Sequence, residues 1–346
     1  MRRSLGFGLV LAALFVPATL FADSITPDTF SATLGVGEST TITKTVTVTD
    51  SAPTTAKVDV FFLVDSTGSM GGLINSVKAS ASSILSTTAG LGDVAFGVGE
   101  YRDIYDTFTY RLNQDITTSQ AAAQAGINNW FAGGGGDFYE ANLFALEEAA
   151  GASWRTGSTR ILVWFGDAPG HDPRAGSTEA SATAALVNAG ITVQALDLRS
   201  LDLTGQASRI TAATGGAVYS GINTSQIVTE IQDAIVATFA EYSTVSLDLS
   251  GVPTGVTVTS VPGAYVGSFT RDATRTFDFD VTFTGDAPGT YSFDINALVD
   301  GGIVASEADR IVVGDAYVIP EPATMALLGM GLAGAGLASR RRRRKD

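Results

Sequence analysis

Between Val58 and Tyr242 the chain alternates short, continuous apolar runs with longer segments of helix-like composition. Runs that are apolar at most successive positions are typical of parallel strands buried on both faces of a sheet. Because successive parallel strands need a long crossover, usually a helix, the alternation predicts a doubly wound α/β domain with a mostly parallel sheet. The expected strands are Val58–Val64, Val94–Val98, Ile161–Phe165 and Ile191–Leu196, and the expected helices are Leu73–Leu85, Ser119–Asn129, Ala141–Ala150, Thr178–Ala189, Gly205–Thr214 and Ser225–Tyr242.

The segments on either side of this domain have a different pattern. Residues 243–313 are rich in Thr, Val and Phe, and Thr276–Phe283 alternates between polar and apolar residues, which predicts an antiparallel β-sandwich. Phe30–Thr49 alternates as well but is too short to be stable alone. We therefore expect one sandwich that contains both segments, with the α/β domain inserted in it. The expected division is a signal peptide (1–22), N-terminal strands (23–56), the α/β domain (57–242), the sandwich (243–316) and a sorting segment (317–346).

The patterns at the two ends of the chain predict targeting segments. Arg2 and Arg3, the apolar run over residues 5–21 and the small residue Ala22 follow the order of a secretory signal peptide, with a retained anchor or a buried helix as the alternatives. The C-terminus has Pro320-Glu321-Pro322, an apolar stretch over residues 323–338, which could nearly cross a bilayer as a transmembrane helix, and a basic end over residues 340–345.

This C-terminal layout resembles the PEP-CTERM sorting signal, which in that family is recognised and cleaved by an exosortase. The resemblance implies a protein exported by a Gram-negative-type bacterium that makes extracellular polysaccharide. Its location would be the cell surface or the extracellular matrix of a biofilm, after transient contact of the C-terminal segment with the inner membrane. An ordinary tail anchor is the alternative, because hydropathy alone does not distinguish a permanent anchor from a transient one.

Composition excludes several classes of function. The chain has no cysteine and a single histidine, His171, so zinc catalysis and Ser-His hydrolysis lack their usual residues. The formal net charge is −14, and eight of the 21 basic residues lie in the two end segments, so the protein between them is strongly acidic. Such a protein is repelled by nucleic acids and anionic membranes and attracts cations. We expect a binding protein and not an enzyme.

The segment Asp65-Ser66-Thr67-Gly68-Ser69 directly follows the first predicted strand. At that place its polar side chains lie at the carboxyl end of a parallel sheet, where ligands bind. The oxygens of Asp65, Thr67 and Ser69 are hard ligands, which favour Mg²⁺, Mn²⁺ or Ca²⁺ over zinc. The alternative is a simple helix cap, but the position after a seven-residue apolar strand favours the metal site.

This segment resembles the metal-ion-dependent adhesion site (MIDAS) of the von Willebrand factor A family, Asp-x-Ser-x-Ser, with Thr67 at the second position. The resemblance extends over about Val58 to Tyr242 and implies that Asp167, just after another central strand, belongs to the same site. The glycine run 133–136 precedes Asp137 and Glu140, which is similar to the integrin β version of this loop. On that pattern Glu140 is a ligand of the first metal and Asp137 a ligand of a second, calcium site.

The remaining ligands of a second site are expected from Asp103 or Glu100, which follow the strand Val94–Val98. Pairing with Arg102 is the alternative explanation for these acids. Gly71-Gly72-Leu73 lacks the acids of a third, regulatory site, and His171 is interpreted as a solvated or hydrogen-bonded bystander.

The resemblance implies a cell-surface or matrix protein with a role in adhesion, whose metal binds an acidic protein or polysaccharide. The alternative is a structural surface-layer or biofilm component in which the metal only stabilises the fold.

Overall fold

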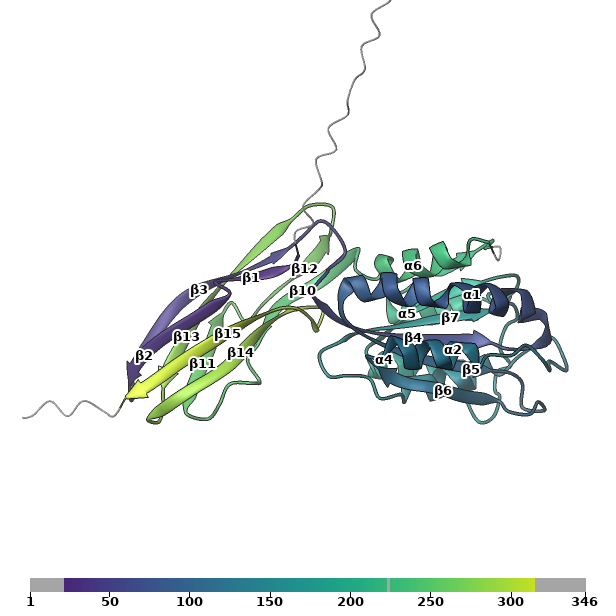
Figure 1. Cartoon of the computed structure of the whole chain (residues 1–346), viewed down its shortest axis with the longest axis horizontal. Helices are drawn as coiled ribbons and strands as arrows, with labels where there is room; N and C mark the ends of the chain where they lie inside the picture. Colours follow the sequence, from purple (N-terminus) through teal and green to yellow (C-terminus); the bar gives the residue numbers. More distant parts are fainter. Residues whose placement is uncertain (1–21, 223–224, 315–346) are drawn as a thin grey trace, which may run out of the picture.

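The computed structural model describes residues 22–222 and 225–314, and it has two parts, an α/β unit and a β-sandwich (Figure 1). The sheet of the α/β unit has the strand order β6-β5-β4-β7-β8-β9, and all neighbours are parallel except β5 and β6. This confirms the doubly wound, mostly parallel fold. The strands are β4 (Ala56–Asp65), β5 (Gly92–Tyr101), β6 (Tyr110–Thr117), β7 (Thr159–Gly166), β8 (Ile191–Asp197) and β9 (Val218–Ser220).

Helices cover both faces of this sheet. Along β4, Val58, Val60 and Phe62 pack towards α1, α2 and α6, whereas Phe61 and Leu63 pack towards α3, α4 and α5. Burial on both faces is why the strand is apolar at successive positions. The helices are α1 (Gly71–Thr88), α2 (Gln120–Asn128), α3 (Asn142–Ala150), α4 (Glu179–Asn188), α5 (Gln206–Thr214) and α6 (Ile227–Ala237), and short 3₁₀ turns are η1 (Gly68–Met70) and η2 (Ala89–Leu91).

The sandwich combines strands from both sides of the α/β unit in the sequence. Its two sheets have the orders β1-β3-β13-β11 and β12-β10-β14-β15-β2. The early strands pair with late ones, β3 with β13 antiparallel and β2 with β15 parallel, so the α/β unit is inserted in the sandwich. The strands are β1 (Ser24–Thr26), β2 (Thr29–Gly35), β3 (Ser39–Val48), β10 (Glu241–Asp248), β11 (Val256–Val261), β12 (Ala264–Thr270), β13 (Arg275–Gly285), β14 (Gly289–Val299) and β15 (Gly302–Gly314).

Alternation along β13 divides its side chains between the two faces. Phe277, Phe279 and Phe283 are buried between the sheets, and Asp278 and Asp280 face outwards. The outward carboxylates accept hydrogen bonds of 2.7 Å from threonines of β3. The strand therefore contributes both to the core and to the cross-strand contacts that fix its register.

The expected helix over 225–242 is wrong at its C-terminal end. Helix α6 ends at Ala237, and β10 begins at Glu241 and pairs with β12 and β14 of the sandwich. Tyr242 and Val245 are buried there among sandwich residues. Packing against a sheet outside the α/β unit overrides the local helical pattern.

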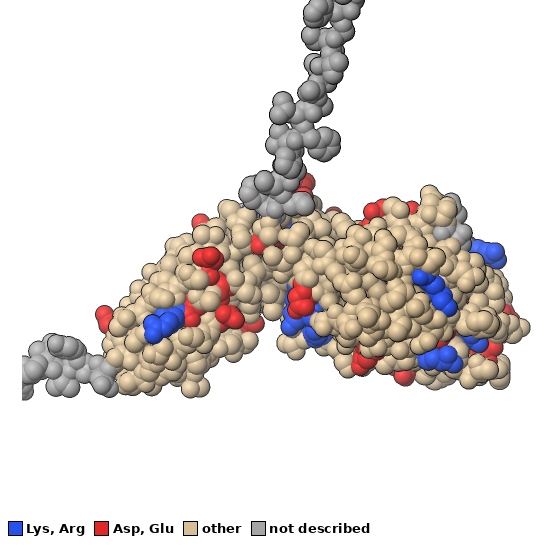
Figure 2. Space-filling model, in the orientation of Figure 1, with Lys and Arg blue, Asp and Glu red and all other residues tan. Residues whose placement is uncertain are grey.

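The two end segments of the sequence analysis, 1–22 and 317–346, lie outside the described residues except for Ala22. Among residues 22–222 and 225–314, no helix is both long and apolar enough to cross a membrane. Figure 2 shows acidic and basic side chains scattered in small groups over one face of both parts. The division of the chain at residues 57, 242 and 316 remains our proposal for the domain boundaries.

Candidate metal centre

Asp65 is the last residue of β4 and is fully buried. Its Oδ1 accepts hydrogen bonds from the backbone N–H and the hydroxyl of Thr67, at 2.8 and 2.7 Å. Its Oδ2 has no hydrogen-bond donor among the described residues. Burial raises the pKa of the Asp65 carboxyl to about 7, although the hydrogen bonds from Thr67 lower it. A buried carboxylate oxygen without a donor is costly, and a cation would compensate it.

Ser69 and Asp167 lie beside this carboxylate. Ser69 Oγ donates to Asp167 Oδ1 at 3.1 Å and lies 3.4 Å from Thr67 Oγ1. Asp167 directly follows β7, the parallel neighbour of β4, so both strands deliver an aspartate to the same edge of the sheet. The negative charge of Asp167 also raises the pKa of Asp65.

Glu140 reaches the same place from a different loop. Its backbone N–H donates to the carbonyl of Pro169 and its carbonyl accepts from the N–H of His171, both at 3.0 Å. The side chain is buried, and Oε2 has no donor in the described part of the chain. Burial, and after it the negative charge of Asp65, raises the pKa of Glu140 to about 9. A second uncompensated carboxylate therefore lies close to the first.

The glycine run 133–136 lets the backbone approach the loop after β4. The N–H of Gly133 donates to Ser66, and the carbonyl of Gly134 accepts from Gly68, at 3.0 and 3.2 Å. Gly134 has a φ of +80°, and a Cβ there would lie 2.1 Å from Asp106 Oδ1. Only glycine fits this combination of backbone conformation and space.

Asp106 was not recognised from the sequence, although it supports this loop. Its Oδ2 accepts from the N–H of Gly135 at 3.0 Å and from that of Asp103 at 3.3 Å. Arg102, which is buried, donates from Nε to the carbonyl of Ser66 at 3.1 Å. The only sequence signal for these roles is their position in the loop that follows a central strand.

The proposed ligands converge on one cleft of about 280 Å³ at the carboxyl edge of the sheet. Thr67, Ser69, Glu140 and Asp167 line it, and Asp65 lies beneath, bonded to Thr67. Three carboxylates and two hydroxyls form an all-oxygen set, which suits Mg²⁺, Mn²⁺ or Ca²⁺. Two of these carboxylate oxygens, Asp65 Oδ2 and Glu140 Oε2, have no donor in the described part of the chain, and a divalent cation fits as their missing partner.

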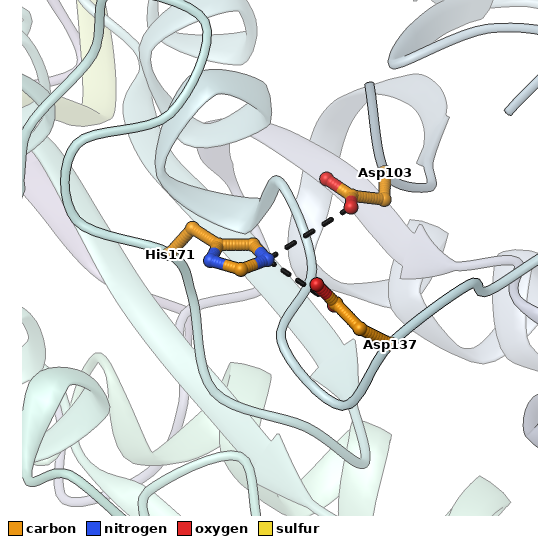
Figure 3. Close-up of side chains that lie close together, drawn as sticks. All are labelled: Asp103, Asp137 and His171. Carbon is orange, nitrogen blue, oxygen red and sulfur yellow. Dashed lines mark hydrogen bonds and ion pairs between the residues drawn. The ribbon is translucent and has the colours of Figure 1, made fainter. Parts of the chain in front are cut away.

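Asp103, Asp137 and His171 form a separate group next to this cleft (Figure 3). One potential ligand atom from each lies within 4.8 Å of the others. His171 Nε2 lies 3.2 Å from Asp137 Oδ1 and 3.9 Å from Asp103 Oδ2. His171 is thus hydrogen-bonded, and the group is the candidate for the second site.

An arginine already neutralises part of this second group. Arg174 Nε donates to Asp103 Oδ1 at 2.8 Å, and its Nη2 contacts Oδ2. Burial raises the pKa of Asp103, but the hydrogen bonds from Arg174 and from the N–H of Ile104 outweigh it and leave the pKa below its ordinary value. The group therefore fits a second cation less well than the first cleft.

Glu100 does not belong to the group of Asp103, Asp137 and His171, and its hydrogen bonds are to other residues. Its Oε1 accepts from Asn113 Nδ2 at 2.9 Å and from Arg111 Nη1 at 3.4 Å, both on the neighbouring strand β6. The alternative in which Arg102 pairs with these acids is wrong, since Arg111 pairs with Glu100 and Arg174 with Asp103.

The chain is similar to known families at two places. Residues 25–292 match the family model described as integrin beta-like protein A-E, vWA-like. Residues 318–344 match the PEP-CTERM protein-sorting motif, which indicates export and surface anchoring. Among curated proteins, alpha-protein kinase vwkA of Dictyostelium discoideum is 30% identical over 118 residues, which are 33% of this chain. The match spans only 19% of that protein, about a fifth of its length.

Solved structures with a similar fold include a von Willebrand factor type A protein from Catenulispora acidiphila. The TM-score is 0.46 at 15% identity, over 84% of this chain and 72% of that one. The pilus adhesin SpaC from Lactobacillus rhamnosus GG, in its open conformation, has a TM-score of 0.42 at 14% identity, over 80% of this chain and 45% of that chain.

Proposed function

Because this chain belongs to the family of vWA-like domains of integrin beta-like proteins A–E, we propose that it is a surface protein that captures an acidic ligand through a divalent metal. Asp65, Thr67, Ser69, Glu140 and Asp167 would hold the ion. A bound ion supplies a Lewis acid with a coordination position open to a carboxylate oxygen of the ligand. We expect binding without turnover, because the described residues that line the first cleft include no histidine or cysteine that could act as a base or nucleophile.

The observation that carries this proposal is a pair of buried oxygens for which the described residues provide no donor, Glu140 Oε2 in the lining of the cleft and Asp65 Oδ2 beneath it. Two buried carboxylate oxygens without a hydrogen-bond donor are unfavourable in a protein core. A cation site explains their arrangement, since a divalent ion offsets the repulsion between the two carboxylates and supplies the contacts that their oxygens lack. A purely structural loop would instead surround these oxygens with backbone N–H groups.

Arg199 supports an acidic ligand. It lines the cleft, is exposed, and lies with Nη1 only 4.0 Å from Asp167 Oδ2. A ligand carboxylate has two oxygens, so one can bind the metal while the other pairs with this guanidinium. Exposed aromatic side chains nearby, Phe138 and Tyr139, add an apolar surface beside the cleft. A carboxylate attached to a ring or an apolar group fits this combination, as in uronic-acid polysaccharides and acidic protein segments.

The position of the site suits a surface protein. Strand β4 begins beside the sandwich, where Thr55 Oγ1 donates to the carbonyl of Val304. Its ten residues span about 33 Å, and the arrow of β4 in Figure 1 points away from the sandwich. The cleft therefore faces away from the sandwich, and the sorting motif that an exosortase would process follows the last sandwich strand. The sandwich acts as a spacer between attachment and ligand.

Binding to immobilised polygalacturonate, to an acidic peptide and to a neutral glucan tests the proposal. In Mg²⁺ or Ca²⁺, the full secreted chain should bind at least one of the two acidic probes and not the glucan, and EDTA should abolish binding. Asp65→Ala should lose binding, whereas the exposed Asp50→Ala variant should keep it. Binding that is unchanged by EDTA overturns the proposal. A metal-induced rise in Tm with no binding of either acidic probe would favour the structural alternative instead.

A further inference from the structure

Lys44 is buried in the core of the sandwich. It lies on β3 between Ile42 and Val46, and the period of two places all three side chains on the inner face of the sheet. Its side chain is 0% exposed, whereas lysine is almost never fully buried without a partner. The partners of this amine therefore need an explanation.

Those partners are two carboxylates on β15, a strand of the opposite sheet. Glu307 and Asp309 are two positions apart and point to the same face, and both side chains are 0% exposed. Lys44 Nζ contacts Glu307 Oε1 and donates to Asp309 Oδ1 at 3.1 Å. Apart from these contacts, no donor among the described residues reaches either oxygen of Glu307 or Asp309 Oδ2.

The surroundings of the three groups are apolar. The rings of Phe30 and Phe283 lie 5.6 and 5.4 Å from Lys44 Nζ, and their centroids are 5.1 Å apart. One amine and two carboxylates would carry a net negative charge if all were ionised, which an apolar core does not tolerate. Burial accordingly lowers the pKa of Lys44 and raises that of Asp309. The site thus favours the neutral form of the Lys44 amine and the protonated form of the Asp309 carboxyl.

We propose that Lys44 and Glu307 join in an intramolecular isopeptide bond and that Asp309 transfers the protons of this reaction. The nitrogen of the neutral Lys44 amine attacks Cδ of the protonated Glu307 carboxyl, and a C–N bond forms while the protonated Asp309 carboxyl passes its proton to the carbonyl oxygen of Glu307. The Asp309 carboxylate formed in this way takes a proton from the nitrogen and passes it to one of the two hydroxyls on Cδ. That hydroxyl leaves as water as its C–O bond breaks, and the remaining hydroxyl returns its proton to Asp309, which is regenerated.

The contacts distinguish the two carboxyl groups. Glu307 touches the amine, and no other donor among the described residues holds it, so its carbon is free to accept the nitrogen. Asp309 already accepts a hydrogen bond from the Lys44 amine. It is therefore in a suitable position to take a proton from this nitrogen. The reaction needs no oxidant, nucleotide or metal, because it exchanges an amine and an acid for an amide and water.

The bond would connect the two sheets of the sandwich, since β3 and β15 belong to different ones. It would also close a covalent ring from residue 44 to residue 307 that contains the whole inserted α/β unit. A cross-link of this length strongly restricts the unfolded chain and so stabilises the sandwich. The inference does not depend on the proposed metal site.

Mass spectrometry of the full secreted chain under denaturing conditions tests the inference directly. The intact mass should be lower by one water molecule than the mass of the processed sequence. A tryptic digest should lack cleavage after Lys44, because its amine is acylated, and should contain the Lys44 peptide joined to the peptide with Glu307. A free Lys44 in the folded wild-type protein, or a link from Lys44 to Asp309, would overturn the proposal.

Variants separate the cross-link from a simple ion pair. Lys44→Arg and Glu307→Ala should show no linked peptide, and Lys57→Arg, at an exposed ammonium, should keep it. Glu307→Gln should still form the same amide with loss of ammonia in place of water. Asp309→Asn should slow the appearance of the linked peptide after refolding by at least tenfold. EDTA should not change the yield, so failure of the metal site and failure of the cross-link give different results.

Discussion

Ser69 Oγ donates a hydrogen bond to Asp167 Oδ1 across 3.1 Å, although 98 positions separate the two residues in the chain. The contact exists because β4 and β7 are parallel neighbours, so the loops that follow them meet at one edge of the sheet. The candidate metal centre is therefore a property of the sheet order, and changes in either loop should affect it.

Metal removal should destabilise the α/β unit. A ligand that binds only the folded state adds about 2.7 kcal/mol at 100 times its dissociation constant, so EDTA should lower the Tm of this unit. Asp65→Ala and Asp167→Ala should each lose most of the metal-dependent shift, with the transition of the sandwich nearly unchanged. Differential scanning calorimetry with Mg²⁺, with Ca²⁺ and with EDTA measures both transitions.

The matched control for this experiment is His171→Ala, which removes a hydrogen-bonded neighbour of Asp137 and no proposed ligand of the first ion. This variant should keep the metal-dependent shift of the parent. A full shift in Asp65→Ala, or its loss in His171→Ala, would place the site on other residues.

The metal-free α/β unit should lose stability as the pH rises from about 4 to about 9. Burial raises the pKa of Asp65 to about 7 and that of Glu140 to about 9, whereas both titrate near ~4 in the unfolded chain. The folded state then binds more protons in this window, so the free energy of unfolding falls with pH and levels off above the raised pKa values. Urea denaturation in EDTA at several pH values measures the slope.

The variant Asp65→Asn/Glu140→Gln carries no titrating group at these positions and should show a flatter profile over the same pH range. Metal affinity should change in the opposite direction in the parent and increase with pH, because ions compete with protons for the same oxygens. An equally steep loss of stability in the double variant would contradict the assignment.

Gly134→Ala should weaken metal binding. The Cβ would lie 2.1 Å from Asp106 Oδ1 in a residue with φ near +80°, so the loop must shift away from Gly68. A non-glycine residue held in this conformation costs about 1–3 kcal/mol. Gly136→Ala is the control, since no atom of the described residues would lie within 4 Å of a Cβ added there. Isothermal titration with Mg²⁺ compares the two, and equal affinities would show that the glycine loop does not shape the site.

Arg174→Ala should make the second group a better cation site. Its guanidinium pairs with Asp103, so its removal leaves Asp103 and Asp137 without this positive charge. Calcium titration should give a higher stoichiometry or tighter second binding than in the parent. Arg209→Ala, which removes a pair with Glu179 elsewhere, should match the parent. No gain in calcium binding would contradict the proposed role of Arg174.

Arg271→Ala should strongly destabilise the sandwich. The guanidinium is buried and donates to both oxygens of Asp23, at 2.9 and 2.7 Å, and to the carbonyl of Thr49. Breaking a buried pair leaves an uncompensated charge and costs about 3–5 kcal/mol. Denaturant unfolding should show a much smaller effect for Arg275→Ala, whose partner Asp272 is exposed. Similar losses in the two variants would show that burial of Asp23 is unimportant.

The sequence by itself determined the class of the fold and the proposed residues of the first cleft. Continuous apolar runs identify strands that are buried on both faces, and the loop after Val64 carries its polar side chains where a parallel sheet binds ligands. Strand β6 was missed because Arg111, Asn113 and Asp115 leave it no apolar run, as expected for an edge strand with exposed side chains. The local pattern of apolar residues therefore identified buried strands better than exposed edge strands.

Only the tertiary structure decided which charges meet. The sequence placed Lys44 in an alternating strand without showing that its inner face meets Glu307 from another sheet. It likewise left open which arginine neutralises Asp103, and Arg174 does so from a loop 71 positions away. Local periodicity reports the direction of a side chain relative to its own strand or helix, whereas the partner of a charge depends on how distant strands and loops pack together.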